Sequence, residues 1–459
     1  MKKYEPFKRT VNWLSAVVNT AFLTFAFAFI WYTCYSQEIV LPFYRKGNWM
    51  VIGLYVVLTV IFNQVYGSYK VGYLRKSEAF YSQLISVFVI NLITYCQISV
   101  IGRDFMHFMP MIFLTVIDII IVLLWTIAYS FVYGKLFPPR RMIIVYGSHN
   151  AGNLVLKMCQ RADKYIIAES VKADEDFQTI KEKILGFGGV ILYDVPDRMR
   201  NDILKFCFDR SLRVYLAPKI SDIIVRGAQE INLFDTPLLL CRNDGLSAEV
   251  RIAKRIIDFV LALLILPFLL LPMAAVAIAI KIEGDGPVIY RQERLTTHGK
   301  RFNVLKFRSM KVNAESDGKA VLAKDNDSRI TKVGAFIRKC RLDELPQIFN
   351  IIKGDMSFVG PRPERPEIAA EYEKDMAEFS FRLTVKAGLT GYAQIMGKYD
   401  TTPYDKLRMD LMYIEKYSLL LDFKIMLMTI KTMIFPGRTN ESENIISAPK
   451  QEISERNKK

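Results

Sequence analysis

Four long apolar runs lie within the first 135 residues, and they constrain the architecture of this chain more than any other feature. They are found at Val11–Thr33, Met50–Gly67, Tyr81–Ile101 and Pro110–Tyr133. Each is close to the roughly 20 residues that a helix needs to cross a bilayer. The sequence therefore predicts four transmembrane helices. A cleaved signal peptide is the alternative for the first run, but the run is too long and no small-residue cleavage site follows it.

Basic residues beside these runs predict how the helices are oriented. They precede the first run and follow the second and fourth runs, at Lys2, Lys3, Lys8, Arg9, Lys70, Arg75, Lys76, Lys135, Arg140 and Arg141. Because positive residues favour the cytoplasmic side, everything after Lys135 is expected to be cytoplasmic. Arg45 and Lys46 fall in an external loop and are exceptions to the rule.

The net charge of +16 raises the question of nucleic-acid binding. The basic residues lie beside apolar segments, however, and no basic helix or platform of aromatic and basic residues is present, so we expect no nucleic-acid partner. Anionic lipid headgroups and phosphate substrates account for the charge better. The six cysteines contain no CxxC pair and the three histidines are isolated, so neither a disulfide framework nor a zinc site is predicted.

Short β-branched runs alternate with polar helical stretches after the fourth apolar run. The runs at Met142–Tyr146, Tyr165–Ala168, Gly189–Tyr193 and Arg213–Leu216 predict a small parallel α/β domain. The glycine turn at 147–152, with Glu169 at the end of the second strand, imitates a dinucleotide site without the GxGxxG spacing. Nucleotide binding and a structural or regulatory role both remain open.

A fifth apolar segment, Ile256–Ile282, has basic residues at both ends and contains Pro267 and Pro272 near its middle. Proline removes a backbone hydrogen bond and kinks a helix. A helix that enters the membrane, bends and returns would keep both ends in the cytoplasm. A kinked helix that spans the membrane is the alternative.

The region from Gly284 to about Thr432 is soluble in character, and its candidate chemistry begins at Asp343-Glu344. These carboxylates stand before a short predicted helix that ends at Gly354. Asp343 is either an ordinary N-cap, with Glu344 complementing the helix dipole, or a nucleophile beside a phosphate bound at the helix N-terminus. In the loop that follows, glycines and prolines surround Arg362 and Arg365, whose guanidinium groups suit phosphate contacts or a surface turn.

An ordered series of motifs between about Lys254 and Thr432 resembles the bacterial sugar transferase family, the monotopic polyprenyl-phosphate phosphoglycosyl transferases. The motifs are Lys254-Arg255 with Asp258, Gly286–Tyr290 with Gln292 and Arg294, Lys306–Met310, Arg329–Thr331 with Gly334, Asp343–Gln347, Gly354–Ser357, Gly360–Pro363, Gly388–Gln394, and Asp410 with Tyr413. With the N-terminal helices and the α/β domain, the whole chain resembles the large members, which act in capsule, O-antigen or exopolysaccharide synthesis.

The resemblance implies a reaction and roles for individual residues. Asp343 would attack the sugar-bearing phosphate of a UDP-sugar, UMP would leave, and undecaprenyl phosphate would then take up the hexose 1-phosphate. Glu344 would help to hold Mg²⁺, which prefers one or two carboxylates together with phosphate oxygens. The substrate phosphates would be bound by Lys306, Arg308, Arg362 and Arg365, and the further motif positions are Arg294, Asp355 and Gln394.

The expected architecture is that of a membrane protein of mixed α and α/β class, located in the bacterial inner membrane. It consists of four transmembrane helices (1–138), a small Rossmann-like α/β domain (139–245), a re-entrant membrane helix (246–283), a mostly helical cytoplasmic catalytic domain (284–435) and a disordered tail (436–459). One departure is Leu266 before Pro267, where family members commonly carry Ser-Pro. Amphipathic stretches at 331–340 and 417–434 are expected either on the membrane surface or in the core.

Two other functions remain open at this point. One is a glycosyl transferase that moves the sugar alone and releases UDP, and the other is a non-catalytic membrane scaffold in polysaccharide assembly. The joint presence of Asp343, Glu344 and Arg362 disfavours the scaffold. No residue identifies the sugar, and an isologous homodimer is expected only because such dimers are common.

Overall fold

The computed structural model describes residues 6–39, 42–43, 46–70, 72–147, 151–311, 327, 329–397 and 401–434. The chain divides into two compact units, Met1–Lys219 and Ile220–Lys459. The tail predicted at 436–459 and the middle of the glycine turn, 148–150, lie outside the described residues.

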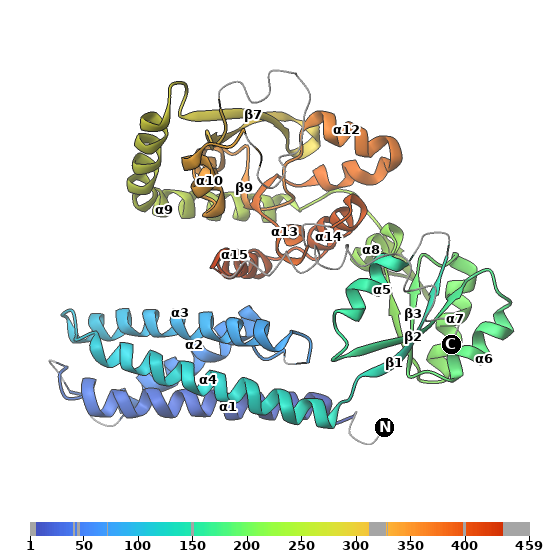
Figure 1. Cartoon of the computed structure of the whole chain (residues 1–459), viewed down its shortest axis with the longest axis horizontal. Coiled ribbons are helices and arrows are strands. Elements are labelled where there is room, and N and C mark those ends of the chain that lie inside the picture. Colours follow the sequence, from blue (N-terminus) through green and yellow to red (C-terminus); the bar gives the residue numbers. More distant parts are fainter. Residues whose placement is uncertain are drawn as a thin grey trace. The chain divides into compact units, whose positions relative to one another are not determined.

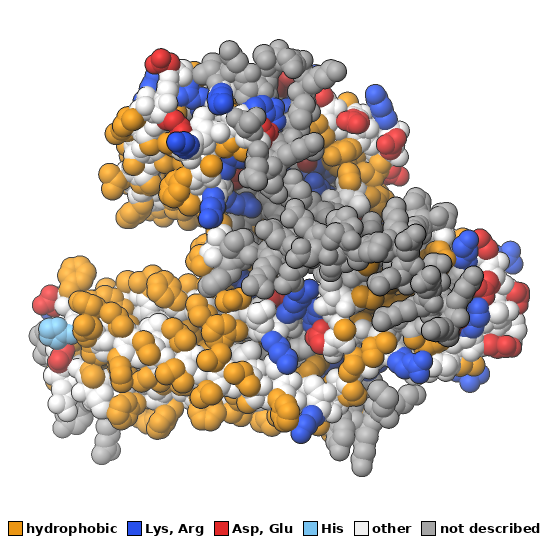
Figure 2. Space-filling model, in the orientation of Figure 1, with side chains coloured by type: hydrophobic (Ala, Val, Ile, Leu, Met, Phe, Trp, Pro, Cys, Tyr) orange, Lys and Arg blue, Asp and Glu red, His pale blue; other side chains and the backbone are white. Residues whose placement is uncertain are grey.

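The first unit begins with helices α1 (Lys8–Ile30, continued by a π-helical turn at Trp31–Tyr35), α2 (Lys46–Tyr66), α3 (Lys76–Gly102) and α4 (Met109–Leu136). They coincide with the four predicted apolar runs, and each is long and apolar enough to cross a membrane. Hydrophobic side chains cover their visible outer face (Figure 2). Polar side chains are buried inside, where Asn91 Nδ2 donates to Asp118 Oδ2 at 2.9 Å. This distribution is typical of helices in a membrane.

A four-stranded parallel sheet in the order β2-β1-β3-β4 completes the first unit. Its strands are β1 (Arg140–Tyr146), β2 (Tyr165–Lys172), β3 (Gly189–Tyr193) and β4 (Arg213–Leu216), and helices α5 (Gly152–Cys159), α6 (Phe177–Leu185) and α7 (Asp197–Asp209) cover both faces (Figure 1). The predicted alternation of strands and helices is confirmed. Any likeness to a nucleotide-binding domain stays a prediction.

One strand of this sheet ends later than the sequence predicts. β2 continues past Ala168 because it pairs with β1 as far as Tyr146, which lies opposite Lys172. Glu169 is therefore inside the strand, opposite Ile143, and the prediction that it ends the strand is wrong.

The second unit is mostly helical and contains short strand pairs. Its elements are α8 (Ile220–Gly227), β5 (Gln229–Leu233), β6 (Thr236–Leu240), α9 (Ala248–Glu283), β7 (Ile289–Leu295), η2 (Thr297–Gly299), β8 (Arg301–Phe307), α10 (Lys332–Lys339), η3 (Leu342–Glu344), α11 (Gln347–Lys353), β9 (Ser357–Val359), α12 (Pro366–Asp375), η4 (Ala377–Thr384), β10 (Gly388–Thr390), α13 (Tyr392–Met396), α14 (Pro403–Glu415) and α15 (Leu419–Ile434). β5 pairs with β6 and β7 with β8, both antiparallel, whereas β9 and β10 are parallel.

The division between the two units precedes the boundary expected from the sequence at residue 245. Ile220 and Ile223 of α8 are buried in one core together with Leu407 and Leu411 of α14. α8 was expected to belong to the α/β domain, but its packing places it with the second unit.

Helix α9 is bent within its length, and Figure 1 shows it as two straight pieces that meet at a sharp angle. Pro267 and Pro272 lie inside the helix and account for the bend. One face packs on the rest of the second unit, where Leu266 and Leu269 lie against a buried cluster that includes residues of α11 and β8. The opposite face is apolar and exposed, and Phe268 and Leu271 are 80% and 79% accessible.

The two amphipathic stretches each divide between core and surface. In α10, Ile337 is buried and Phe336 is exposed. In α15, Ile425 is buried, while exposed apolar side chains include Leu420 and Phe423. Each helix thus has one apolar face in the core and one exposed apolar face, and a location on the membrane surface stays a prediction.

Candidate active site

Asp343 and Glu344 lie in a tight turn between α10 and α11. Arg341, with a φ of 56°, reverses the chain into the 3₁₀ turn η3. α11 then begins at Gln347 with Pro346 as its N-cap, and ends at Gly354, whose φ of 99° favours glycine. The short helix is confirmed, but Asp343 is not its N-cap. The N-cap interpretation of Asp343 is therefore wrong, and its side chain is half-buried next to Glu344 in the chain.

Glu344 receives two cations on one carboxylate oxygen. Lys306 Nζ donates to Glu344 Oε1 at 3.2 Å, and Arg362 Nη2 donates to the same atom at 3.1 Å. Burial alone would raise the pKa of Glu344, but Arg362 and Lys306 outweigh it and lower the pKa to about 2. Glu344 is therefore ionised at neutral pH.

Asp343 has the opposite electrostatic environment. Burial raises its pKa, the neighbouring charge of Glu344 adds to this, and Lys306 and Arg338 oppose it. Burial and a like charge both favour a state in which Asp343 carries no charge. The protonated acid is not a nucleophile, but a carboxylate with a raised pKa is more basic once it is ionised, and a more basic carboxylate attacks phosphorus more readily.

Asn350 holds the strand that carries Lys306 against the helix that follows Glu344. Its side chain, 3% exposed, accepts from Leu305 N at 3.0 Å and donates to Asn303 O at 2.8 Å, both in β8. Arg255 of α9 donates to the carbonyls of Ile351 and Ile352 at 2.6 Å each, and so places a cation at the C-terminus of α11.

The loop that carries Arg362 is fixed by backbone pairing and by two arginines. Gly360 N donates to Thr390 O at 2.9 Å. A Cβ at Gly360 would lie 2.3 Å from Lys386 O, so no larger residue fits there. Arg294 Nη1 donates to Pro363 O at 3.2 Å, and Arg382 Nη2 donates to Arg362 O at 2.9 Å.

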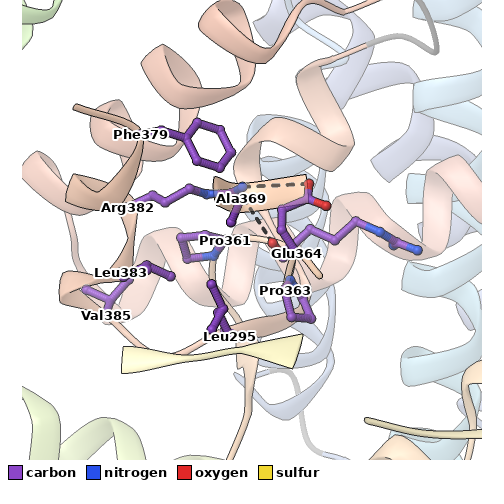
Figure 3. Close-up of a pocket in the computed structure, with 11 residues that line it drawn as sticks. Leu295, Pro361, Pro363, Glu364, Ala369, Phe379, Arg382, Leu383 and Val385 are labelled. Atoms are coloured by element: carbon purple, nitrogen blue, oxygen red, sulfur yellow. Dashed lines mark hydrogen bonds and ion pairs between the residues drawn. The ribbon is translucent and has the colours of Figure 1, made fainter. Parts of the chain in front are cut away.

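Arg382 was missed by the sequence analysis. It is 3% exposed and lies 2.7 Å from Asp410 Oδ2. Glu364 Oε1 is 3.7 Å away, and Phe379 lies beside the guanidinium (Figure 3). Arg382, Glu364 and Phe379 line a pocket together with Pro361 and Leu383. No local pattern marks Arg382 in the sequence, because its partners are distant along the chain.

The other predicted site residues lie in different surroundings. Arg308 donates to the carbonyls of Asp285 and Gly284, at 2.5 and 2.8 Å, and so caps the end of α9. Asp355 pairs with Lys353 at 2.8 Å. Gln394 lies in α13, with no hydrogen-bond partner for its side-chain atoms in the described residues. Arg365 is the N-cap residue of α12. The hydrogen bonds of Arg308 and the ion pair of Asp355 thus go to residues other than Glu344.

A divalent cation has candidate ligands at this turn. Among the described residues, no group of three or more His, Cys, Asp or Glu side chains is arranged to hold a metal. Mg²⁺ needs only one or two carboxylates, because substrate phosphates and water complete its octahedron. The adjacent carboxylates of Asp343 and Glu344 fit that requirement.

The fold and the site together define a membrane protein with mixed α and α/β content and a carboxylate centre surrounded by cations. Residues 249–436 match the family described as Bacterial sugar transferase. A Bacillus subtilis protein, named as a candidate undecaprenyl-phosphate N-acetylgalactosaminyl 1-phosphate transferase, is 48% identical over 130 residues, which are 28% of this chain and 72% of that protein. The chain belongs to the bacterial sugar transferase family.

Two longer relatives match a larger part of the chain. The Aeromonas hydrophila UDP-N-acetylgalactosamine-undecaprenyl-phosphate N-acetylgalactosaminephosphotransferase is 40% identical over 258 residues, 54% of this chain and 60% of the relative. The Escherichia coli UDP-glucose:undecaprenyl-phosphate glucose-1-phosphate transferase is 40% identical over 223 residues, 48% of this chain and 45% of the relative. The matches thus span only about half the length of these two relatives.

Proposed function

We propose that this protein transfers a hexose 1-phosphate from a UDP-sugar to undecaprenyl phosphate and releases UMP, as the first membrane step of capsule, O-antigen or exopolysaccharide synthesis. The observation that carries the proposal is the turn in which Asp343 stands beside a Glu344 that is paired with Lys306 and Arg362. The names of the relatives support the reaction class and disagree on the sugar, which is glucose in one and N-acetylgalactosamine in another.

The reaction proceeds in two displacements at one phosphorus atom. A carboxylate oxygen of Asp343 forms a bond to the phosphorus that bears the sugar, and the bond from that phosphorus to the bridging oxygen breaks. UMP leaves with the electron pair. A phosphate oxygen of undecaprenyl phosphate then attacks the same phosphorus, and the Asp343 carboxylate is released with the sugar diphosphate-lipid as product.

Lys306 and Arg362 lower the energy of both steps. They lie on the same side of Glu344 and offer charge where negative charge collects on the phosphoryl oxygens. Arg362 is 47% exposed, so its remaining donors are accessible to a substrate. Mg²⁺, held by Glu344 together with substrate oxygens, would supply further neutralisation of the diphosphate.

The membrane arrangement follows from the same proposal. The acceptor phosphate of a lipid is accessible only at headgroup depth, so the carboxylates must lie at that depth. A re-entrant α9 with both ends in the cytoplasm would achieve this, and its proline bend and exposed apolar face support that topology. The catalytic unit is then cytoplasmic, at the inner membrane.

The test uses purified full-length protein with Mg²⁺, undecaprenyl phosphate and a panel of UDP-sugars, with UMP and UDP measured separately. The proposal expects UMP release that depends on the lipid for turnover and disappears in Asp343→Asn. Release of UDP instead would indicate a glycosyl transferase. A protein that releases neither nucleotide from any UDP-sugar would support the scaffold alternative.

A further inference from the structure

Arg382 is a buried cation whose position the proposed chemistry does not itself require. Its side chain is 4% exposed and that of its partner Asp410 is 2% exposed. A buried ion pair is expensive to desolvate, and packed apolar residues in its place are often as stable. General stability therefore does not explain why a buried ion pair lies next to the loop that carries Arg362.

Arg382 contacts side chains from two other parts of the chain and also binds the carbonyl of Arg362. Arg382 comes from η4, Asp410 from α14 and Glu364 from the loop. The same guanidinium nitrogen that lies 2.7 Å from Asp410 Oδ2 also donates to Arg362 O at 2.9 Å. Arg382 thus holds the backbone of the very residue whose side chain reaches Glu344.

The loop has little other freedom at this point. Pro361 and Pro363 flank Arg362, and each fixes its own φ near −65°. Gly360 packs directly on the backbone of Lys386, and Arg294 holds the carbonyl of Pro363. Fixing the Arg362 carbonyl therefore sets the direction in which the Arg362 side chain leaves the backbone.

We propose that Arg382 and Asp410 are positioning residues that hold the backbone of Arg362 so that its guanidinium meets Glu344 and the substrate phosphate. The pair touches neither the substrate nor the reacting carboxylate. It acts through Arg362, and the inference rests on the proposed function for the role of Arg362 in transfer.

The first measurement is independent of activity. Hydrogen exchange is followed in the full-length protein, in lipid nanodiscs, for the peptide that covers residues 357–366. Arg382→Gln and Asp410→Asn are each expected to raise its exchange by about tenfold, because the loop opens more often without its anchor. Asp405→Asn and Arg408→Gln are the controls, since they break another Arg–Asp ion pair, 3.0 Å long and less buried, within α14. The controls should leave this peptide unchanged.

The second measurement is a double-mutant cycle in UMP release. Arg382→Gln alone should lower kcat by about 100-fold, the scale of an ångström-sized misplacement. In an Arg362→Lys background the same change should add less than about twofold, because residues that act as one unit are not additive. Arg382→Lys should recover part of the loss.

The outcomes separate this inference from the proposed function. Unchanged exchange of the 357–366 peptide in Arg382→Gln overturns the anchoring, whatever the activity. Faster exchange with fully additive losses of kcat shows that the pair does not act through Arg362 and also overturns the inference. If the wild-type protein releases no UMP, the proposed function fails, and the exchange data alone decide whether Arg382 anchors the loop.

Discussion

At the residue scale, Glu344 is the point at which the cations of the site meet. One oxygen accepts from both Lys306 and Arg362, which come from a strand and from a loop far apart in the sequence. Without the carboxylate, the two cations would repel each other in a half-buried site. Glu344 therefore holds Lys306 and Arg362 together, and in the proposed function it would also offer a ligand to Mg²⁺.

Glu344→Gln should lower kcat by about 100-fold or more, because a neutral amide neither balances two cations nor binds Mg²⁺ well. UMP release measured across a Mg²⁺ titration checks this. Glu293→Gln is the matched control: Glu293 pairs with Arg301 at 3.5 Å on the exposed β7–β8 hairpin, and activity should change by less than about twofold. Near-normal activity in Glu344→Gln would contradict the assignment.

Asp410 gives the site a dependence on pH. Burial raises the pKa of Asp410 to about 6; Arg382 opposes this shift, Glu364 adds to it, and Lys406 opposes it weakly. Below this pH Asp410 is protonated, and Arg382 loses the nearer of these two carboxylate partners, while Glu364 Oε1 stays 3.7 Å away. We expect kcat to fall on the acidic side with a midpoint near pH 6, and Asp410→Asn to be slow at every pH without that acidic limb.

The fall in kcat should not reflect unfolding through this group. Since the folded pKa of Asp410 lies above its unfolded value, the folded state binds more protons between about pH 4 and 6, and stability from this residue rises as pH falls. A melting temperature that drops together with activity near pH 6 would point to another cause.

Site residues that lie in motifs could be predicted from the sequence. Residues whose role depends on contacts with distant parts of the chain could not. Asp343, Glu344 and Arg362 stand in recognisable motifs, and the structure brings Glu344, Lys306 and Arg362 together. Arg382 was not found, because its partners Asp410 and Arg362 are about 20 to 30 residues away. Arg308 lies in a recognisable motif, but its guanidinium caps the end of α9. The spacing of residues in the sequence does not reveal that contact.

At the element scale, Asn350 fixes the register between β8 and α11. Asn350→Ala should lower the free energy of unfolding by about 2 kcal/mol, since it removes two hydrogen bonds and leaves a partly buried N–H and a partly buried carbonyl without these partners. It should also lower UMP release, because Lys306 follows directly in β8. Thermal unfolding and activity are measured together.

Asn303→Ala is the matched control for this change. The exposed side chain of Asn303 is removed, while its carbonyl still accepts from Asn350. Stability and activity should remain near wild type. Equal losses in the two variants would show that the asparagine bridge does not hold these elements.

The topology of α9 can be tested by labelling its two ends. In a cysteine-free background, Ser247→Cys and Gly284→Cys, which flank the helix, should both react with a membrane-impermeant maleimide from the cytoplasmic side only. Reaction of the two ends from opposite sides would show a spanning helix. A Pro267→Ala, Pro272→Ala variant should favour the spanning form, because the bend loses its cause.

Helices and strands with clear hydrophobic periodicity were predicted well. Boundaries that depend on tertiary contacts were not predicted correctly. The four apolar helices and the α/β strands appear where the sequence places them. β2 runs past its predicted end because β1 offers it a partner as far as Tyr146. α8 has the composition of a helix in either unit, and only its burial against α14 decides where it belongs.

At the scale of the whole molecule, the family match lies entirely within the second unit. A protein that begins at Ile220 should therefore retain UMP release with undecaprenyl phosphate. A protein that begins at Leu246 should unfold at a lower temperature and lose activity, because Ile220 and Ile223 are missing from the core. Equal behaviour of the two would contradict the boundary at Lys219. The homodimer expected from base rates stays a prediction.

The central claim is the covalent step at Asp343, and it is tested most directly by mass spectrometry of the protein incubated with Mg²⁺ and its UDP-sugar in the absence of lipid acceptor. We predict an added mass of one hexose phosphate, located by peptide mapping on Asp343, removed by undecaprenyl phosphate and absent in Asp343→Asn. An active protein that never carries this mass, or that carries it equally in Asp343→Asn, would contradict the account.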